Sequence, residues 1–334
     1  PRTMKNGSPI RWGILACGGI ARKFADDLAF VKDGYLAAVS SRDINRAEEF
    51  ASHYGPDVKC FGSYEAMLAS GEIDVVYIAS PHGLHYEHTL LCLNAGLPVL
   101  CEKAFAINSK QVAEMIQTAR DKKIFLMEAL WTRFHPSIVK LQEILASGVI
   151  GDIVHLAADF GFHAPYDAKA RWFNPALTGG SLLDIGIYPL FISKFVLGEP
   201  LEMKATGVMA PSGVDMNTSI ALNYSSGATA TLFSTFATKT DTTCEIHGTK
   251  GKIQMHSRFH ETKGITVTIH ETEQETFYET ERLGWGYSYE AEAVQADLRA
   301  GRTENALMTH AFSTELMALL DEIRSQIGLK YPNE

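Results

Sequence analysis

The stretch Ile10-Arg11-Trp12-Gly13-Ile14-Leu15-Ala16-Cys17-Gly18-Gly19-Ile20-Ala21-Arg22-Lys23-Phe24 decides how the rest of the chain is interpreted. Its first half is apolar enough for a buried strand, and the recurrence of Ile20, Phe24 and Leu28 predicts a helix after it. A strand, a glycine turn and a helix form a cradle for a phosphate, because the first N–H groups of the helix point at the anion. The residues expected to line this cradle are Cys17, Gly18, Gly19 and Ile20.

The glycine pattern of the turn departs from the dinucleotide fingerprint G-x-G-x-x-G/A. Ala16 stands at the first glycine position, Gly18 holds the second and Ala21 the third. A strand-to-helix turn with two glycines is also common in α/β proteins as a purely structural connection. The turn alone therefore leaves a dinucleotide site and a purely structural turn equally open.

Length and composition indicate a globular protein with two domains. The chain has 334 residues, of which 46% are apolar and 21% charged. Its 30 basic and 39 acidic residues give a net charge of −9, which argues against nucleic acid or an anionic membrane as the main partner. Any phosphate ligand must then be held by local basic groups.

The cysteines indicate a reducing compartment, and we expect a cytoplasmic protein. Their number is odd and their spacing shows no C-x-x-C pair, which indicates neither a disulfide framework nor a zinc site; they are Cys17, Cys60, Cys92, Cys101 and Cys244. No uninterrupted apolar run of about 18 residues is seen, so neither a membrane span nor a signal peptide is expected. Residues 1–8 are expected to be an irregular start.

Short apolar strands alternate with amphipathic helices over residues 9–130. Such alternation predicts parallel pairing with helices on both faces, which is the doubly wound Rossmann sheet. The expected strands are Ile10–Ala16, Tyr35–Ser40, Val75–Ala79, Pro98–Glu102 and Phe125–Leu130. The expected helices are Ile20–Val31, Asn45–Tyr54, Tyr64–Ala69, His85–Ala95 and Ser109–Arg120.

The pattern changes over residues 131–334, where longer alternating strands predict a C-terminal α/β domain with a large open, mostly antiparallel sheet. The expected strands are Ile153–Phe162, Met203–Met209, Ser219–Tyr224, Ala228–Phe236, Thr242–His247, Ile265–His270 and Glu275–Tyr278. The expected helices are His135–Ala146, Glu290–Arg299 and His310–Ile327. The face with Thr229, Thr231, Phe233 and Thr235 is either a subunit interface or a solvated face.

The end of the second expected strand favours NADP as the coenzyme. Arg42 follows Ser41 and lies 24 residues beyond Gly18 (42 − 18), where an NAD enzyme carries a carboxylate for the ribose hydroxyls. A small hydroxyl residue followed by arginine leaves room for a 2′-phosphate and supplies its charge. In the alternative, Arg42 pairs with an acid such as Asp43, and Asp43 serves NAD.

A histidine-rich turn follows the strand at Val75–Ala79, where a coenzyme passes in this fold. Ser80, Pro81, His82 and His85 are therefore expected to contact the coenzyme. The spacing of His82, His85 and His88 also invites a metal, but no acidic or cysteine partner completes a ligand set, and we expect none.

The strand at Pro98–Glu102 delivers Glu102 and Lys103 to the same edge of the sheet. A lysine beside a nicotinamide can hydrogen-bond a substrate hydroxyl and stabilise alkoxide character in the transition state. The alternative is a structural ion pair of Lys103 with Glu102 or Asp184.

A second cluster of chemically active residues lies at Arg171-Trp172 and Thr178–Pro189. Gly179-Gly180 is expected to let the backbone approach a ligand, and Asp184 and Tyr188 are four residues apart, so they share one face of a helix. Pro189 is expected to kink this helix and aim Tyr188 at the site. A positioned phenol can exchange a proton, although a core tyrosine is equally open.

In order along the chain, these motifs resemble the Gfo/Idh/MocA oxidoreductase family, in particular its dihydrodiol and NADP-dependent xylose dehydrogenase branch. The resemblance runs from residue 10 to residue 329. It rests on Ala16–Ala21, Ser41-Arg42-Asp43 with Arg46, Ser80-Pro81 with His85, Glu102-Lys103, Trp131–Pro136 and Gly179–Tyr188.

The resemblance implies a Rossmann domain, a second domain whose sheet mediates dimers, and hydride transfer in the cleft between them. It implies that Lys103 and Tyr188 are catalytic, that Asp184 supports them, and that Arg42 selects NADP. Coenzyme contacts are also expected from Arg46, Glu102, Trp131 and Arg133, and substrate contacts from Arg171, Trp172 and Phe191. Ala16 and Ala104 depart from the family pattern, as does Phe191, which stands where many sugar-oxidising members carry aspartate.

We therefore expect an NADP-dependent oxidoreductase, with NAD as the alternative coenzyme. It is expected to act on a secondary alcohol of a sugar, polyol or vicinal diol and to form a homodimer or a higher homo-oligomer. Two rival functions stay open on the same fold: a non-catalytic nucleotide-binding sensor, which Ala16 and Ala104 motivate, and an NAD-dependent glycosidase.

Overall fold

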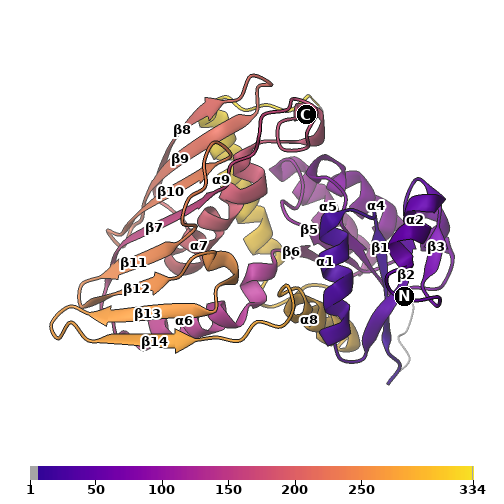
Figure 1. Ribbon diagram of the computed structural model, residues 1–334, viewed down its shortest axis with the longest axis horizontal. Coiled ribbons are helices and arrows are strands. Elements are labelled where there is room, and N and C mark those ends of the chain that lie inside the picture. Colours follow the sequence, from indigo (N-terminus) through magenta and orange to yellow (C-terminus); the bar gives the residue numbers. More distant parts are fainter. Residues whose placement is uncertain (1–6, 333) are drawn as a thin grey trace. The chain divides into compact units, whose positions relative to one another are not determined.

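The computed structural model describes residues 7–332 and 334, and the chain divides into two compact units (Figure 1). The first unit comprises residues 7–134 and 283–317, and the second comprises residues 135–282 and 318–334, apart from residue 333. Of the irregular start expected for residues 1–8, residues 1–6 lie outside the described residues. Each unit is described by itself below.

The first unit is built on a six-stranded parallel sheet in the order β3-β2-β1-β4-β5-β6. The strands are β1 (Ile10–Leu15), β2 (Gly34–Ser40), β3 (Lys59–Phe61), β4 (Val75–Ile78), β5 (Val99–Glu102) and β6 (Leu126–Ala129). This order reverses direction at β1, so β1 and β4 flank the switch point at which ligands of doubly wound sheets bind. The Rossmann architecture predicted from the sequence is confirmed.

Helices connect these strands, and several begin at side-chain caps that the sequence supplies. The connecting helices are α1 (Gly19–Asp27), α2 (Ile44–Ala51), α3 (Tyr64–Ala69), α4 (His85–Asn94) and α5 (Ser109–Lys122), and α8 (Ser288–Arg299), which follows β14 in the chain, also belongs to this unit. Asp43, Ser63 and Asn108 accept hydrogen bonds from the first turns of α2, α3 and α5. In the core, the Phe24 ring stacks on Tyr77 with 3.8 Å between centroids.

The second unit carries an eight-stranded sheet in the order β14-β13-β12-β11-β7-β10-β9-β8. All neighbouring strands pair antiparallel except β7 and β10, which are parallel. The prediction of a mostly antiparallel sheet is confirmed. The strands are β7 (Ile153–Gly161), β8 (Glu202–Met209), β9 (Asp215–Asn223), β10 (Thr229–Thr235), β11 (Cys244–Gly248), β12 (Gly251–Met255), β13 (Gly264–Ile269) and β14 (Glu275–Glu279).

Helices cover one face of this second sheet (Figure 1). They are α6 (Pro136–Ala146), α7 (Ile187–Leu197) and the end of α9 (His310–Ile327). Side chains on the inner face of the sheet are buried, such as Ile220, Leu232 and Ile246. On the opposite face Thr231 is exposed and Phe233 is partly exposed, so the described residues leave this part of the face uncovered.

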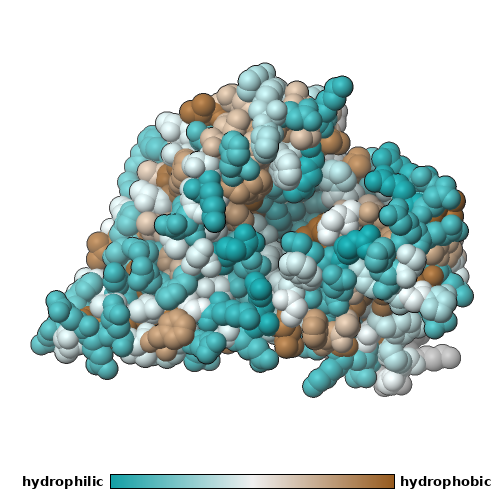
Figure 2. Space-filling view, viewed as in Figure 1, coloured by the Kyte–Doolittle hydropathy of each residue, from teal (hydrophilic) through white to brown (hydrophobic). Residues whose placement is uncertain are grey.

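One helical stretch, Pro175–Leu197, is long and apolar enough to cross a membrane by length and composition. The sequence alone suggested no such stretch. However, 83% of its most apolar segment is buried inside the protein, as in a core helix. The stretch is therefore weak evidence for a membrane span. The face of the molecule in Figure 2 is a mixture of hydrophilic groups and scattered apolar groups, which is ordinary for a protein surface.

Residues 283–317 pack with the first unit although they follow the second sheet in the chain. The Trp12 indole donates to Gln295 of α8 at 2.9 Å, and Asp27 accepts from the N–H groups of Trp285 and Tyr287 at 2.9 and 2.7 Å. The predicted division into 9–130 and 131–334 places residues 283–317 in the second domain, whereas in the structure they pack with the first unit. Sequence periodicity could not show which core α8 joins, because the pairing is not local.

Candidate active site

The turn between β1 and α1 has the shape that a dinucleotide phosphate needs. Ala16 has a φ of 77°, a left-handed conformation that normally favours glycine. Gly18 caps α1 without a side-chain hydrogen bond, and a Cβ added to Gly18 or Gly19 would meet no atom of the described residues within 4 Å. The N-terminus of α1 is therefore open to an anion, and the turn fits the coenzyme predicted for it.

Cys17 and Ile20 flank this opening. The Cys17 thiol lies 3.5 Å from the carbonyl oxygen of Ser40, and burial raises its pKa to about 11. The thiol is therefore protonated at neutral pH and offers no charge that would repel a phosphate. Ile20 is half-buried in the first turn of α1.

Arg42 is exposed at the end of β2 and lines a cavity of about 460 Å³ together with Tyr64 and His88. Ser41, before it, is buried and donates its N–H to Phe61 at 3.1 Å. The Asp43 carboxylate accepts from the Asn45 N–H at 2.9 Å as the N-cap of α2. This acid is thus occupied locally, which weakens the NAD alternative. Arg46 lies exposed on α2, with its charge acting on Cys17.

His85 joins two of the predicted coenzyme segments from within the core. Its Nδ1 lies 2.6 Å from the Ala104 oxygen and its Nε2 2.8 Å from the Ser80 oxygen. Burial lowers the pKa of His85 to about 4, so the neutral ring donates to one of the two carbonyls. The ring thus lies between these two segments inside the first unit, and the coenzyme contact expected of His85 stays a prediction.

The remaining histidines of this turn are also buried. His82 packs edge-on against His85 with 5.7 Å between centroids, next to Pro81. His88 Nδ1 lies 2.8 Å from the Ser80 hydroxyl. Residues 7–332 and 334 contain no group of three or more His, Cys, Asp or Glu side chains that could hold a metal ion.

Glu102 and Lys103 lie at the carboxyl end of β5, at the edge of the sheet where the glycine turn also lies. The Glu102 carboxylate is buried and accepts from the Tyr77 hydroxyl and from the Lys103 N–H, the latter at 3.2 Å. The Lys103 side chain is only partly buried, and the peptide bond to Ala104 is cis. An ammonium at this edge can donate a hydrogen bond to a substrate oxygen.

Trp131 and Arg133 occupy a short 3-10 helix, Trp131–Phe134, at the end of β6. The Trp131 ring stacks on Tyr287 with 4.6 Å between centroids. Arg133 is 8% exposed, and burial lowers its pKa. Both residues thus contribute to packing of the first unit, in addition to any contact with a coenzyme.

In the second unit, Arg171 and Asp184 form an ion pair. Nη2 of Arg171 lies 3.4 Å from the Asp184 carboxylate, and the Arg171 side chain is 58% exposed while that of Asp184 is 12% exposed. Trp172 packs edge-on against Phe162, with 5.9 Å between centroids. The pair joins the segment before the glycines to the helix that carries Tyr188.

Gly179 and Gly180 are needed for packing. A Cβ on Gly179 would lie 2.7 Å from the Trp172 oxygen, and one on Gly180 would lie 2.2 Å from Asp215 Oδ1. The buried Asp215 accepts hydrogen bonds from Ser181 and Leu182, each at 2.8 Å. The main chain of Trp172 and the side chain of Asp215 fill the space beside these glycines, and the approach of a ligand expected here stays a prediction.

Residues Leu182–Gly186 form a π-turn ahead of α7, where the sequence predicted a regular helix with a kink at Pro189. The helical backbone runs without a break from Ser181 to Leu197, so Pro189 lies inside this run, as predicted. The irregularity lies in the turn directly before it, around Asp184. Such π-turns recur at functional sites because they re-aim the side chains around them.

Tyr188 is 5% exposed and is held by rings from two other segments. Its ring centroid lies 5.6 Å from that of Phe160 on β7 and 4.8 Å from that of His260. Phe160 and His260 in turn stack on each other at 4.6 Å. Sequence reasoning missed both partners, because nothing local in the sequence links them to Tyr188.

Phe191 is fully buried on α7 and stacks on Phe195 at 5.9 Å between centroids. α7 is apolar nearly all round, so its sequence has no polar face that shows where each side chain points. The substrate contact expected of Phe191 stays a prediction.

Two sequence profiles match the chain. That of the oxidoreductase family with an NAD-binding Rossmann fold covers residues 10–130, and that of the GFO/IDH/MocA C-terminal domain covers residues 138–254. Trans-1,2-dihydrobenzene-1,2-diol dehydrogenase of Xenopus laevis is 38% identical over 96% of this chain and 99% of its own. D-xylose 1-dehydrogenase (NADP(+)) of Hypocrea jecorina is 34% identical over 98% of this chain and 95% of its own.

Solved structures show the same architecture. KijD10, a 3-ketoreductase from Actinomadura kijaniata in complex with TDP-benzene and NADP, superposes with a TM-score of 0.84 at 26% identity, over 96% of this chain and 98% of its own. The family predicted from the ordered motifs is thus confirmed by both domains. The chain belongs to the Gfo/Idh/MocA family of NAD(P)-dependent oxidoreductases, and it is a dehydrogenase of that family.

Proposed function

We propose that the protein uses NADP to oxidise a secondary alcohol of a sugar, polyol or vicinal diol, or to reduce the corresponding ketone. The observation that carries the choice of NADP is Arg42, an exposed guanidinium at the end of β2 beside an acid already used as a helix cap. The named activities of the xylose and dihydrodiol dehydrogenases support the substrate class.

Each candidate residue has a separate role in this reaction. A bound nicotinamide supplies the hydride acceptor or donor. The open N-terminus of α1 and Arg42 hold the phosphates. Lys103 donates a hydrogen bond to the substrate oxygen and stabilises negative charge on it, and Tyr188 exchanges the proton of that oxygen. Asp184, through its pair with Arg171, orients the substrate side of the site.

Two rivals are distinguished by the same assay. A nucleotide-binding sensor would bind the coenzyme without turnover, and a glycosidase that uses NAD transiently would release sugar with no net change in nicotinamide absorbance. The presence of both Lys103 and Tyr188 favours the dehydrogenase, because an ammonium group and a phenol both suit hydrogen bonding and proton exchange with a substrate oxygen.

The test is nicotinamide absorbance with NADP⁺ or NAD⁺ and a panel of aldoses, inositols and vicinal diols. We expect turnover with at least one of these compounds and a preference for NADP⁺. Tight nucleotide binding without turnover on any compound would favour the sensor, and sugar release without reduction would favour the glycosidase.

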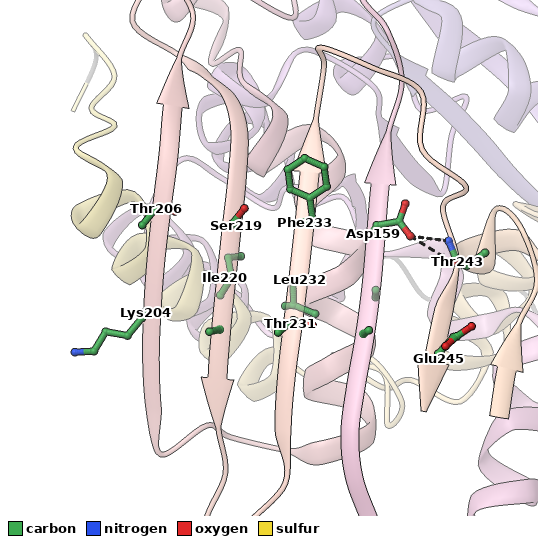
Figure 3. Close-up of a pocket in the computed structure, with 13 residues that line it drawn as sticks. Asp159, Lys204, Thr206, Ser219, Ile220, Thr231, Leu232, Phe233, Thr243 and Glu245 are labelled. Carbon is green, nitrogen blue, oxygen red and sulfur yellow. Dashed lines mark hydrogen bonds between the residues drawn. The ribbon is translucent and has the colours of Figure 1, made fainter. Parts of the chain in front are cut away.

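The open face of the second sheet supports a further proposal, a homodimer with two-fold symmetry. A hollow of about 590 Å³ crosses five strands there, floored by small side chains such as Ala157, Ala221 and Thr231 (Figure 3). Lys204 lies at one side of the hollow on β8 and Glu245 at the other on β11. A two-fold axis parallel to the strands and through the centre of this face would bring Lys204 of each copy to Glu245 of the other, as an isologous interface allows.

The dimer is tested by mass measurement in solution. Phe233→Glu, at the centre of the face, is expected to yield monomers, because it would place a charge in the interface. Leu201→Glu, at a residue 76% exposed outside the hollow, is the control and should leave the mass unchanged. A monomeric wild-type protein would contradict the proposal.

We also propose a cytoplasmic location. All five cysteines are free thiols, which suits a reducing compartment. Fractionation of cells that express the tagged protein would test this, and recovery from an extracytoplasmic fraction would contradict it.

A further inference from the structure

We infer that Glu128 is a positioning residue for Lys103: its buried carboxylate fixes the main chain just after Lys103 and supplies a negative charge that attracts the ammonium group. The inference rests on the catalytic role proposed for Lys103. The residues concerned all belong to the first unit.

The position of Glu128 follows from the pairing of the last two strands. β5 and β6 are parallel neighbours, with Cys101 opposite Glu128 and Glu102 opposite Ala129. Phe105 donates its N–H to Glu128 Oε2 at 3.1 Å. Since Phe105 is two residues beyond Lys103, this hydrogen bond holds the segment on which the lysine leaves the sheet.

His85 holds the same segment at the preceding residue, through the Ala104 carbonyl at 2.6 Å. The main chain after Lys103 is thus fixed at successive residues, by an imidazole at a carbonyl and by a carboxyl group at an N–H. His85 is neutral at neutral pH, because burial lowers its pKa to about 4. Of these two anchors, only Glu128 brings a charge.

A carboxyl group at this place is costly for the fold. Glu128 is 2% exposed, and its Oε1 has no hydrogen-bond partner among the described residues. An unsatisfied buried polar atom destabilises a protein, so an apolar or amide side chain would serve this strand better. Buried, perturbed acids beside a catalytic group commonly serve the reaction.

The charged and titratable groups around Glu128 come from its neighbouring strand and from α9. On β5 and its end they are Cys101, Glu102 and Lys103. On α9, the Ser313 hydroxyl stabilises the carboxylate, and His310 lies 2.8 Å from the Leu126 carbonyl two residues earlier. Lys103 is the group whose charge attracts the Glu128 carboxylate.

Burial, offset by Ser313, the Phe105 N–H and Lys103, raises the pKa of Glu128 to about 7. The carboxyl group therefore gains its charge within the neutral range. In the ionised form it is the stronger acceptor for the Phe105 N–H and the better neighbour for an ammonium group. Turnover is then expected to rise with pH as Glu128 ionises.

The test is Glu128→Gln in the full-length protein loaded with NADP⁺ and a substrate that the wild type oxidises. Glutamine keeps the shape and an acceptor for the Phe105 N–H but removes the charge. We expect kcat to fall about tenfold above pH 7, as for the exchange of a charged for a neutral hydrogen bond, and its rise between pH 6 and 8 to flatten. The Kd for NADP⁺ should stay unchanged.

Asp297→Asn is the matched control, because Asp297 is also a buried carboxylate of the first unit but hydrogen-bonds Arg302 and Asn305. It should leave the pH profile of kcat as in the wild type. A Glu128→Gln protein with wild-type kcat and pH profile would overturn the inference. Failure of the proposed function is distinguishable from this result, because the wild type itself would then show no turnover.

Discussion

The two segments that carry the proposed catalytic residues are held in different ways. Lys103 projects from a network of buried polar groups, in which Glu102, Glu128 and His85 bind the main chain on either side of it. Tyr188 is held by ring contacts, with Phe160 and His260 on it and on each other. Charge therefore governs the first segment and packing the second, and substitutions in the two should have different signatures.

The largest effect is expected from removal of the Lys103 charge. Lys103→Met should lower kcat by about 10³-fold, because the substrate oxygen loses its hydrogen-bond donor, within the range for removal of one acid–base group. Kd for NADP⁺, measured by fluorescence titration, should change little. Lys110→Met, at an exposed lysine of α5, is the control and should retain full activity.

The Glu128→Gln variant should gain stability at alkaline pH while it loses activity. Burial raises the folded-state pKa of Glu128 to about 7 from an ordinary 4.5, so the folded state binds the proton more tightly than the unfolded state. The wild type then loses stability as pH rises from about 5 to 7, by roughly 3 kcal/mol in all, and the glutamine variant does not. Urea denaturation at pH 5 and pH 8 measures this; an equal free-energy difference between the two proteins at both pH values would contradict it.

Arg42→Ala should weaken NADP⁺ binding by about 10- to 100-fold, the loss of one or two charge-assisted hydrogen bonds to the 2′-phosphate. The Kd for NAD⁺, which lacks this phosphate, should stay within about twofold. Calorimetric titration with both coenzymes checks this. An equal loss of affinity for NADP⁺ and NAD⁺ would show that Arg42 binds a group that both coenzymes contain.

The smallest effect is expected in the ring cluster. His260→Ala should lower kcat/KM about fivefold, because Tyr188 loses a packing partner worth roughly 1 kcal/mol. His260→Phe should restore most of that loss and leave the pH profile unchanged, since packing and not charge is what the ring supplies. A changed pH profile in the phenylalanine variant would show that charge governs this segment too.

The sequence predicted the first unit well because its signals are local. Apolar runs marked each strand except β3, which has only three residues, and amphipathic stretches marked the helices between them. In the second unit, β12 was missed because it follows a glycine turn directly and only Ile253 and Met255 in it are apolar. Chain order also could not show that α8 packs with the first unit.

The site was only partly predictable for the same reason. Ala16 showed a turn with a missing glycine, and the structure shows that alanine keeps the left-handed conformation there. By contrast, His260 lies 72 residues beyond Tyr188 (260 − 188), and a long-range contact of this kind leaves no local pattern. Glu128 sits in an otherwise apolar strand, and that conflict was the one signal available for it.

The central claim is that Lys103 and Tyr188 act in the same chemical step with NADP. It is tested most directly by measuring kcat/KM with NADP⁺ and one alcohol that the wild type oxidises. The proteins compared are the wild type, Lys103→Met, Tyr188→Phe and the double variant. We expect each single variant to lose at least about 10²-fold and the double variant to lose little more than the worse single one, since residues that act as a unit are not additive. Losses that multiply, or a single variant with wild-type rates, would contradict the account.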